Sequence, residues 1–171
     1  MKRSSKRARR EPARSSHFDA RGSARMVDVG AKPATAREAV ARGRVELSRE
    51  ALRAVARGSA AKGDVLGVAR IAAIQAAKRT AEWIPLCHPL PLDALEVDFA
   101  TSEEPPAIEI EARARTTAKT GVEMEALVAV SAAALAIYDM LKSLDRSMVI
   151  GALRLVRKSG GRSGAYERAD G

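Results

Sequence analysis

Two neighbouring segments alternate apolar and polar residues in the way that a half-buried β-strand requires. Residues 94–100 place Leu95, Val97 and Phe99 at every second position, and residues 107–116 alternate Ile and Ala with charged residues. The stretch TSEEPP between them has turn composition. This pattern predicts an antiparallel hairpin with one buried face and one face in water.

Two helices are predicted in the first half of the chain. Ser48 can cap a helix over residues 49–58 that ends at Gly58. Asp64 can cap a second helix. Val65, Val68, Ile71 or Ala72, and Gln75 follow at helical spacing, so we expect a second, packed helix.

The clearest helix pattern runs over about residues 120–144. The string TGVE matches a capping box between Thr120 and Glu123. Apolar residues then recur at helical spacing and form a continuous stripe. The stripe consists of Leu127, Val130, Ala134, Ile137, Leu141 and Leu144.

Two further strands complete the predicted order. Residues 37–47 read as an irregular strand broken near Gly43, and residues 148–156 read as a final strand. The order strand, helices, strand, strand, helix, strand predicts an α+β fold of the ferredoxin-like (split βαβ) type. In this fold an antiparallel sheet carries its helices on one face.

The string IPLCHPLPL, residues 84–92, holds the only cysteine and one of two histidines between prolines. Each proline removes a backbone donor and keeps the preceding residue out of the helical region. The segment therefore reads as a stiff, extended connector. It holds Cys87 and His88 in fixed positions, for function or for structure.

The composition suits one globular domain with a basic tail. The chain has 171 residues, of which 46% are hydrophobic, which is enough for one core. Of the net charge of +9, residues 1–16 carry +6, since they hold seven Lys or Arg and one Glu. We expect a basic, disordered tail over 1–16, a single domain over 17–165 and a flexible C-terminus over 166–171. The tail can be a solubilising segment, a contact for nucleic acid or a membrane surface, or a targeting segment.

Cysteine and aromatic content weigh against several classes of protein. One cysteine cannot form an intrachain disulfide, and with two histidines it cannot build a conventional structural zinc site. Only 3% of residues are aromatic, so a nucleic-acid groove lined with stacking rings is not expected. Charged residues interrupt the apolar pattern at 122–144, so no membrane span is expected. A reducing, cytoplasmic setting is the simplest interpretation.

Asp139 and Lys142 lie on one flank of the long helix, together with Met124 and Ser131 and with Glu125 at the outer edge. An ammonium held near a partly desolvated carboxylate can serve as an acid/base couple. The alternative is an ordinary surface ion pair.

The carboxylates of this helix are too far apart for one small site. Glu125 and Asp139 are separated by 14 positions, or about 21 Å at 1.5 Å per residue. A single substrate atom cannot touch both within one subunit. Either the substrate is long, or each site combines the Glu125 end of one subunit with the Asp139 end of another.

Two lysines lie where anions are favoured. Lys62, in KGDV, precedes a helix start, where backbone amides attract anions, although a solvated loop lysine is the alternative. Lys158 lies in RKSGGRSG, which permits a backbone nest for phosphate and is equally typical of a frayed terminus.

Several long strings in this order resemble the MoaC family, the cyclic pyranopterin monophosphate synthases of molybdenum cofactor biosynthesis. They are MVDV, KGDV, IQAAKRT, IPLCHPLPL, KTGVEMEAL, IYDMLK and KSGG. The resemblance covers about residues 17–164. It implies a lyase that converts 3′,8-cyclo-7,8-dihydro-GTP to cyclic pyranopterin monophosphate and releases diphosphate. It also implies a ferredoxin-like fold and a homohexamer, a trimer of dimers, with active sites at subunit interfaces.

The resemblance assigns residues to two groups. The catalytic residues it implies are Asp139, Lys62 and Lys142. The substrate-binding residues it implies are Leu86, Cys87, His88, Glu123, Met124, Glu125 and Lys158. We expect the two catalytic lysines to move protons and stabilise negative charge, while the aspartate orients Lys142 or acts as a base. No cofactor or protein-held metal is implied, although Mg²⁺ can accompany the phosphates as a counter-ion.

Two other classes of protein remain open on sequence alone. A non-catalytic oligomeric module for a nucleotide or pterin would bind without turnover. A nucleic-acid binder would depend on residues 1–16, so deleting them would abolish its binding and its salt dependence.

Overall fold

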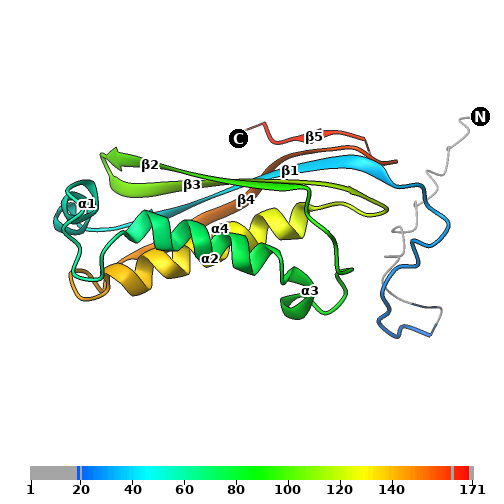
Figure 1. The fold of residues 1–171 in the computed structure, drawn as a ribbon, viewed down its shortest axis with the longest axis horizontal. Helices are drawn as coiled ribbons and strands as arrows, with labels where there is room; N and C mark the ends of the chain where they lie inside the picture. Colours follow the sequence, from blue (N-terminus) through cyan, green and yellow to red (C-terminus); the bar gives the residue numbers. More distant parts are fainter. Residues whose placement is uncertain (1–18, 20, 163, 170–171) are drawn as a thin grey trace, which may run out of the picture.

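Four long antiparallel strands form the frame of the molecule (Figure 1). The computed structural model describes residues 19, 21–162 and 164–169, so the basic tail expected over 1–16 lies outside the described residues. In chain order the elements are β1 (Thr35–Glu46), α1 (Arg49–Ala56), α2 (Val65–Ala77), α3 (Thr80–Trp83), β2 (Ala94–Glu103), β3 (Pro106–Ala118), α4 (Glu123–Leu141), β4 (Val149–Ser159) and β5 (Tyr166–Glu167).

The described strands form one sheet in the order β2-β3-β1-β4-β5, with every neighbouring pair antiparallel. α2 and α4 run side by side along one face of this sheet (Figure 1). β1 and β2 are joined through helices and have β3 between them, which is the split βαβ arrangement. The predicted α+β fold, with helices packed on one face of an antiparallel sheet, is confirmed.

The hairpin predicted from alternation is β2 with β3, and both strands are longer than the pattern indicated. Their register pairs Val97 with Ala112 and Leu95 with Ala114. Ile108, Ile110 and the two alanines of β3 are at most 1% exposed, because they face α2 and α4. The period of two therefore identified the buried face correctly.

The irregularity expected near Gly43 is present. The pairing of β1 with β4 shifts register between Arg42 and Arg44. A Cβ at Gly43 would lie only 2.6 Å from Val130 Cγ1, which no ordinary packing permits. Glycine is needed here because α4 approaches the strand closely.

Two of the three predicted helix caps are confirmed. The Ser48 hydroxyl accepts a hydrogen bond from Ala51 N–H, and the Asp64 carboxylate accepts one from Gly67 N–H. The capping box at the start of α4 is wrong. The N-cap there is Val122, and no side chain caps the helix, because the Glu123 carboxylate is instead held by the Lys158 ammonium at 2.7 Å.

The apolar stripe of α4 is largely as predicted, with Val130, Ala134, Ile137 and Leu141 at most 2% exposed. Leu144 does not belong to the stripe. It lies beyond the helix and is 39% exposed, because the chain turns toward β4 after Leu141.

Two local features differ from the expectation. The proline segment begins with a turn, in which Cys87 N–H donates to the Ile84 carbonyl, and only then becomes extended. The short helix α3 precedes it and carries no amphipathic pattern of its own. Near the C-terminus, β5 pairs with Arg157 and Lys158 of β4, and the flexibility expected over 166–171 stays a prediction.

α4 is long and apolar enough to cross a membrane by length and composition alone, so the expectation that its charges exclude this is wrong. Core helices of water-soluble proteins pass the same test. Of its most apolar window, 61% is buried inside the fold. Packing on α2 and on the sheet explains the apolar composition.

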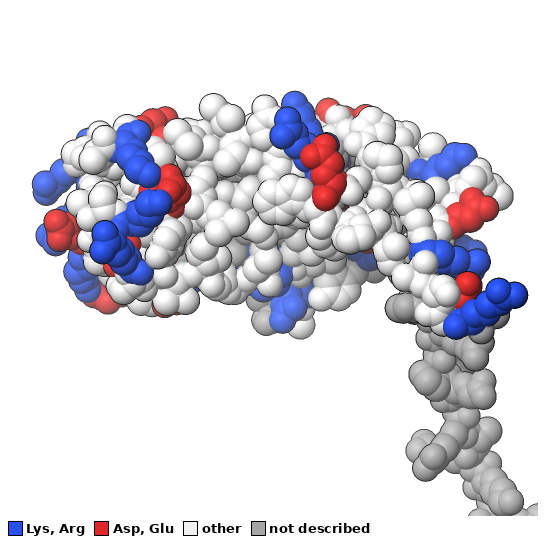
Figure 2. All heavy atoms as spheres, turned by 90° about the horizontal axis from the view of Figure 1, so that it is seen from below, with Lys and Arg blue, Asp and Glu red and all other residues white. Residues whose placement is uncertain are grey.

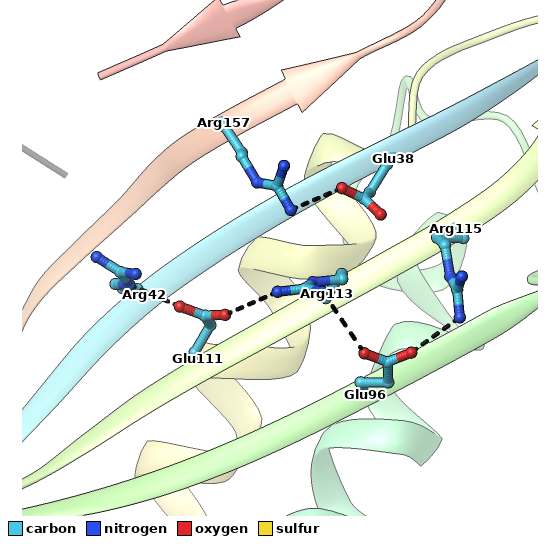
Figure 3. Close-up of polar contacts among 7 residues, drawn as sticks. All are labelled: Glu38, Arg42, Glu96, Glu111, Arg113, Arg115 and Arg157. Carbon is cyan, nitrogen blue, oxygen red and sulfur yellow. Dashed lines mark hydrogen bonds and ion pairs between the residues drawn. The ribbon is translucent and has the colours of Figure 1, made fainter. Parts of the chain in front are cut away.

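The sheet face opposite the helices is covered by ion pairs (Figure 3). Glu111 bridges Arg42 at 2.8 Å and Arg113 at 3.5 Å, and Glu96 continues the row to Arg115 at 2.8 Å. In these partly exposed pairs, charges of opposite sign face each other across neighbouring strands, as in an ordinary solvent-facing sheet surface.

Candidate active site

The C-terminal end of α4 carries a cluster of two lysines and one aspartate. Lys142 Nζ lies 2.7 Å from Asp139 Oδ1, as the sequence spacing predicts. Lys62 Nζ lies 2.8 Å from Asp139 Oδ2 and 2.8 Å from the Asp139 carbonyl oxygen. The antiparallel packing of α2 on α4 brings the start of one helix to the end of the other (Figure 1). The fold therefore joins three residues that the sequence placed in two separate motifs.

Electrostatics fix the charge state of Asp139. Hydrogen bonds from Lys142 and Lys62 lower the pKa of Asp139 to about 2. The carboxylate is thus ionised at every physiological pH. Lys62 also neutralises part of the negative end of the helix dipole, because it binds a carbonyl of the last turn. All three side chains are exposed, by between 41% and 57%, so the cluster faces outward.

A pocket of about 280 Å³ lies at the other end of α4. It brings together most of the substrate-binding residues that the resemblance implies, namely Leu86, Cys87, His88, Glu123, Met124 and Glu125. The segment around Val27 and Val29 supplies another wall. His88 Nε2 lies 2.8 Å from the Val27 carbonyl oxygen, which can only accept, so Nε2 carries the proton.

Glu125 is buried, although the sequence places it at the outer edge of the flank beside the apolar stripe. It is only 4% exposed, and it lines the same pocket as Val27, Leu86 and Cys87. Burial, with a smaller contribution from Glu123, raises the pKa of Glu125 to about 7. A carboxyl group with this pKa can donate or accept a proton near neutral pH.

The Cys87 thiol belongs to the wall of the same pocket. Burial, together with Glu125 and Glu123, raises its pKa above the usual 9.0. The thiol therefore stays protonated at neutral pH and is a poor nucleophile. This environment favours a packing role for Cys87 over covalent chemistry.

A second and larger cavity of about 790 Å³ adjoins the pocket, and Lys32, Thr120, Gly121 and Glu123 line both. Four basic side chains line the second cavity: Lys32, Arg37, Lys119 and Arg162. No sequence pattern indicated Lys32, Arg37 or Lys119, whereas Arg162 lies in the string RKSGGRSG, whose composition permits a phosphate nest. The four side chains come from chain segments far apart, and only the pairing of β1 with β3 and β4 gathers them.

Glycines shape the edge of this basic cavity. Gly160 and Gly161 have φ values of +92° and +71°, which side chains rarely adopt. A Cβ at Gly161 would collide with the Arg37 guanidinium, and one at Gly160 would collide with the Ala36 carbonyl. Lys158, just before them, pairs with Glu123 at 2.7 Å. The geometry is that of a glycine-rich turn beside cations, which suits a phosphate group.

The two groups of site residues do not meet within one chain. α4 is continuous from Glu123 to Leu141, so the separation of about 21 Å between Glu125 and Asp139 holds in the folded protein. The structure thus gathers the lysine–aspartate cluster at one end and the pocket with the basic cavity at the other.

The part of the chain that the structure describes contains no evident metal-binding site. No group of three or more His, Cys, Asp or Glu side chains there could hold a metal ion. Mg²⁺ carried by substrate phosphates stays a prediction. Cys87 is a free thiol.

A pocket that adjoins a basic cavity, with a titratable carboxyl group in its wall, is typical of an enzyme for an anionic small molecule. Sequence comparison gives the family. The chain belongs to the MoaC family, whose model matches residues 26–161.

Curated relatives agree with this membership. The chain is 62% identical to a cyclic pyranopterin monophosphate synthase of Thermomicrobium roseum over 154 residues, covering 90% of this chain and 93% of the relative. It is 62% identical to the one of Pelotomaculum thermopropionicum over 89% of each chain. It is 57% identical to the one of Novosphingobium aromaticivorans over 90% of this chain and 97% of the relative.

Proposed function

We propose that this protein is a lyase with cyclic pyranopterin monophosphate synthase activity in molybdenum cofactor biosynthesis. Its substrate would be 3′,8-cyclo-7,8-dihydro-GTP, and its products cyclic pyranopterin monophosphate and diphosphate. Relatives of this name match about 90% of the chain at about 60% identity. The observation that carries the proposal is the pocket beside the basic cavity, since the two spaces suit the base and the triphosphate of one substrate.

The basic cavity would bind the triphosphate. Lys32, Arg37, Lys119 and Arg162 provide four positive charges, and the Gly160–Gly161 turn provides backbone amides. Lys158 lies beside Glu123, at the border between the two spaces. It would contact the phosphate nearest the ring system.

The lysine–aspartate cluster would carry the proton transfers. With a pKa of about 2, Asp139 is too weak a base to take protons near pH 7. Its role is therefore to orient Lys62 and Lys142, which it holds by 2.8 and 2.7 Å contacts. Closure of the cyclic phosphate forms a bond from a substrate hydroxyl to the α-phosphorus and breaks the α–β anhydride. One of the two lysines, as the neutral amine, would take the hydroxyl proton and become an ammonium, and the cations would stabilise the departing diphosphate.

Both ends of α4 are needed in this scheme, so the active site would combine two chains. The separation of about 21 Å between the ends supports this arrangement. Assembly as a homohexamer, a trimer of dimers, remains our expectation, as does a cytoplasmic location.

The test is release of diphosphate from the purified cyclised dihydro-GTP, with wild type compared with Asp139→Asn and Lys142→Ala. We expect wild type to turn over and both variants to bind substrate and stall. A control for folding and assembly is sedimentation of each variant. Binding without turnover by wild type would reject the lyase and favour the non-catalytic binding module.

A further inference from the structure

Asp145 is a buried carboxylate that the proposed chemistry does not use. It lies three positions after Lys142 and is only 8% exposed. Ser147 N–H at 2.8 Å and the Ser147 hydroxyl at 2.6 Å donate to Oδ1, and Ser48 N–H at 2.7 Å donates to Oδ2. A carboxylate taken out of water is costly unless such hydrogen bonds replace its hydration. Both carboxylate oxygens are therefore engaged by the protein.

The turn that follows α4 is folded around Asp145. Lys142 is the C-cap of α4. The N–H groups of Leu144 and Asp145 both fold back and donate to the Leu141 carbonyl, at 2.8 and 3.1 Å. The two hydrogen bonds from Ser147 then close the turn on its other side. The backbone that carries Lys142 is thus held at both ends.

The third hydrogen bond joins this turn to the start of α1. Ser48 is the N-cap of α1 and lies 97 positions from Asp145 in the chain. At the far end of α1, Ser59 N–H donates to the Ala54 carbonyl at 3.0 Å, and the segment that carries Lys62 follows directly. In Figure 1, α1 and the turn after α4 lie at the same end of the molecule. The position of α1 therefore sets where the backbone of Lys62 lies.

The lysine–aspartate cluster needs such support because it is exposed to water. Its three side chains are all exposed. Seen from the helix side, many charged side chains crowd the end of the molecule that carries α1 (Figure 2). Water and neighbouring charges compete for each ammonium group, and exposed ion pairs contribute little by themselves. The backbones that carry the two lysines must therefore fix the geometry of the cluster.

We propose that Asp145 is a positioning residue: by tying α1 to the turn after α4, it holds Lys62 and Lys142 at a fixed separation. The contacts form a closed ring. From Asp145 the ring runs through Ser48 and α1 to Lys62, which contacts Asp139 and so returns to the end of α4. The inference rests on the proposed function, which gives the cluster the proton transfers. A displacement of about 1 Å in such a group can lower a rate about 100-fold.

Substitutions at Asp145 test the tie directly. Asp145→Ala removes both acceptor oxygens, whereas Asp145→Asn keeps one oxygen, which can face Ser147 or Ser48 N–H but not both. We expect kcat for diphosphate release to fall about 10- to 100-fold in the alanine variant and less in the asparagine variant. KM should change less than about twofold, because the pocket and the basic cavity lie at the other end of α4.

A destabilised variant without contact to the turn separates positioning from stability. Val97→Ala removes buried volume from β2, where Val97 is 5% exposed and lines neither cavity. All variants are compared well below the melting temperature of the least stable one. Val97→Ala should keep the wild-type kcat. Wild-type kcat in folded Asp145→Ala and Asp145→Asn would overturn the proposal.

Proline at position 48 breaks the same tie from the other side. Ser48 has a φ of −67°, which proline also adopts, so Ser48→Pro fits the backbone and removes the N–H. Ser48→Ala is the matched reference, because both variants lose the hydroxyl that caps α1 and only the proline variant loses the N–H. We expect Ser48→Pro to be about tenfold slower than Ser48→Ala. Combined with Asp145→Ala, it should add no further loss, since both changes break one contact. Equal kcat in the two Ser48 variants would overturn the proposal.

Crystal structures of the variants test the geometry without reference to activity. In Asp145→Ala and in Ser48→Pro we expect Lys62 Nζ to leave the Asp139 carboxylate, from which it lies 2.8 Å in the intact protein. An unchanged contact between these two groups in both variants would overturn the proposal. If wild type releases no diphosphate while the variants lose this contact, the proposed function fails and the positioning role stands.

Discussion

The two ends of α4 place carboxyl groups in opposite environments. Asp139 is exposed and held by two ammonium groups, so its pKa falls to about 2. Glu125 is 4% exposed in the wall of a pocket, so burial raises its pKa to about 7. One helix thus carries a permanently charged orienting group and a group that can change its protonation near neutral pH. Environment, rather than residue type, separates the two roles.

Substituting either lysine that Asp139 holds should have the largest effect on the rate of catalysis. Lys62→Ala and Lys142→Ala should each lower the rate of diphosphate release by about 10²- to 10⁴-fold, because a positioned proton donor or acceptor is lost. Lys62→Arg and Lys142→Arg keep the charge but cannot transfer a proton at neutral pH. Steady-state rates of all four variants check this. An arginine variant with wild-type rate would show that its lysine acts by charge alone.

A third carboxylate, Asp145, shows that a carboxylate close to Asp139 in the sequence can still be buried. Asp145 lies just beyond the exposed end of α4, yet it is only 8% exposed and accepts hydrogen bonds from Ser48 N–H and from Ser147. Asp145→Ala should lower the free energy of unfolding by about 2 kcal/mol, because Ser48 N–H and Ser147 lose a charged acceptor in a partly buried setting. Denaturant unfolding at pH 7 measures it, with the exposed Asp139→Ala as the control that stays close to wild type.

The pH dependence of that contribution has a definite sign. The Ser147 hydroxyl is the main cause that lowers the pKa of Asp145 below its ordinary 3.8. The stability that Asp145 provides is therefore present above pH 3.8 and is lost as the pH falls further. An equal loss of stability in the Asp139→Ala control would contradict the contrast drawn between the buried and exposed carboxylates.

A substitution at Gly161 tests whether the basic cavity, at the Glu125 end of α4, binds phosphate groups. Gly161→Ala places a methyl group against the Arg37 guanidinium, so diphosphate should bind about tenfold more weakly, the loss of about one charged hydrogen bond. Gly164→Ala is the matched control, because Gly164 has a similar φ of +69° and no neighbour within 4 Å. Calorimetric titration with diphosphate measures both. Equal weakening in both variants would trace the effect to backbone strain.

Glu125 should give a smaller, pH-dependent effect on stability. Its folded pKa of about 7 lies above the ordinary 4.5, so the folded state binds the proton more tightly. The resulting stabilisation is complete below pH 4.5 and is lost as the pH rises through 7. Glu125→Gln removes this dependence, so its melting temperature relative to wild type should rise between pH 5 and pH 8. A constant difference across that range would show that Glu125 is ionised in the folded protein.

Deleting residues 1–16 should have the smallest effect on catalysis. This segment carries +6 of the net charge but lies outside the residues matched by the family model. Diphosphate release should therefore be unchanged, while retention on an anionic polymer such as heparin should fall and become less salt-dependent. Loss of activity in the deletion variant would give the tail a catalytic role that the present scheme lacks.

Sequence patterns predicted the structure correctly where the interaction joins residues only a few positions apart. Alternation identified the buried face of β3, and Ser48 and Asp64 were correctly identified as caps, because both depend on residues a few positions apart. The capping box of Glu123 was wrong because Lys158, 35 positions away, competes for the same carboxylate. A local pattern cannot include such a distant partner.

The sequence by itself determined the α+β order of elements, the helix that carries Asp139 and Lys142, and the distance between the two ends of that helix. These follow from the periods and rise of regular structure. Only the tertiary structure decided that Lys62 meets Asp139, that Glu125 is buried, and that Lys32, Arg37, Lys119 and Arg162 surround one cavity. Burial and long-range electrostatics depend on which segments pack together, and strand pairing and helix packing fix that choice.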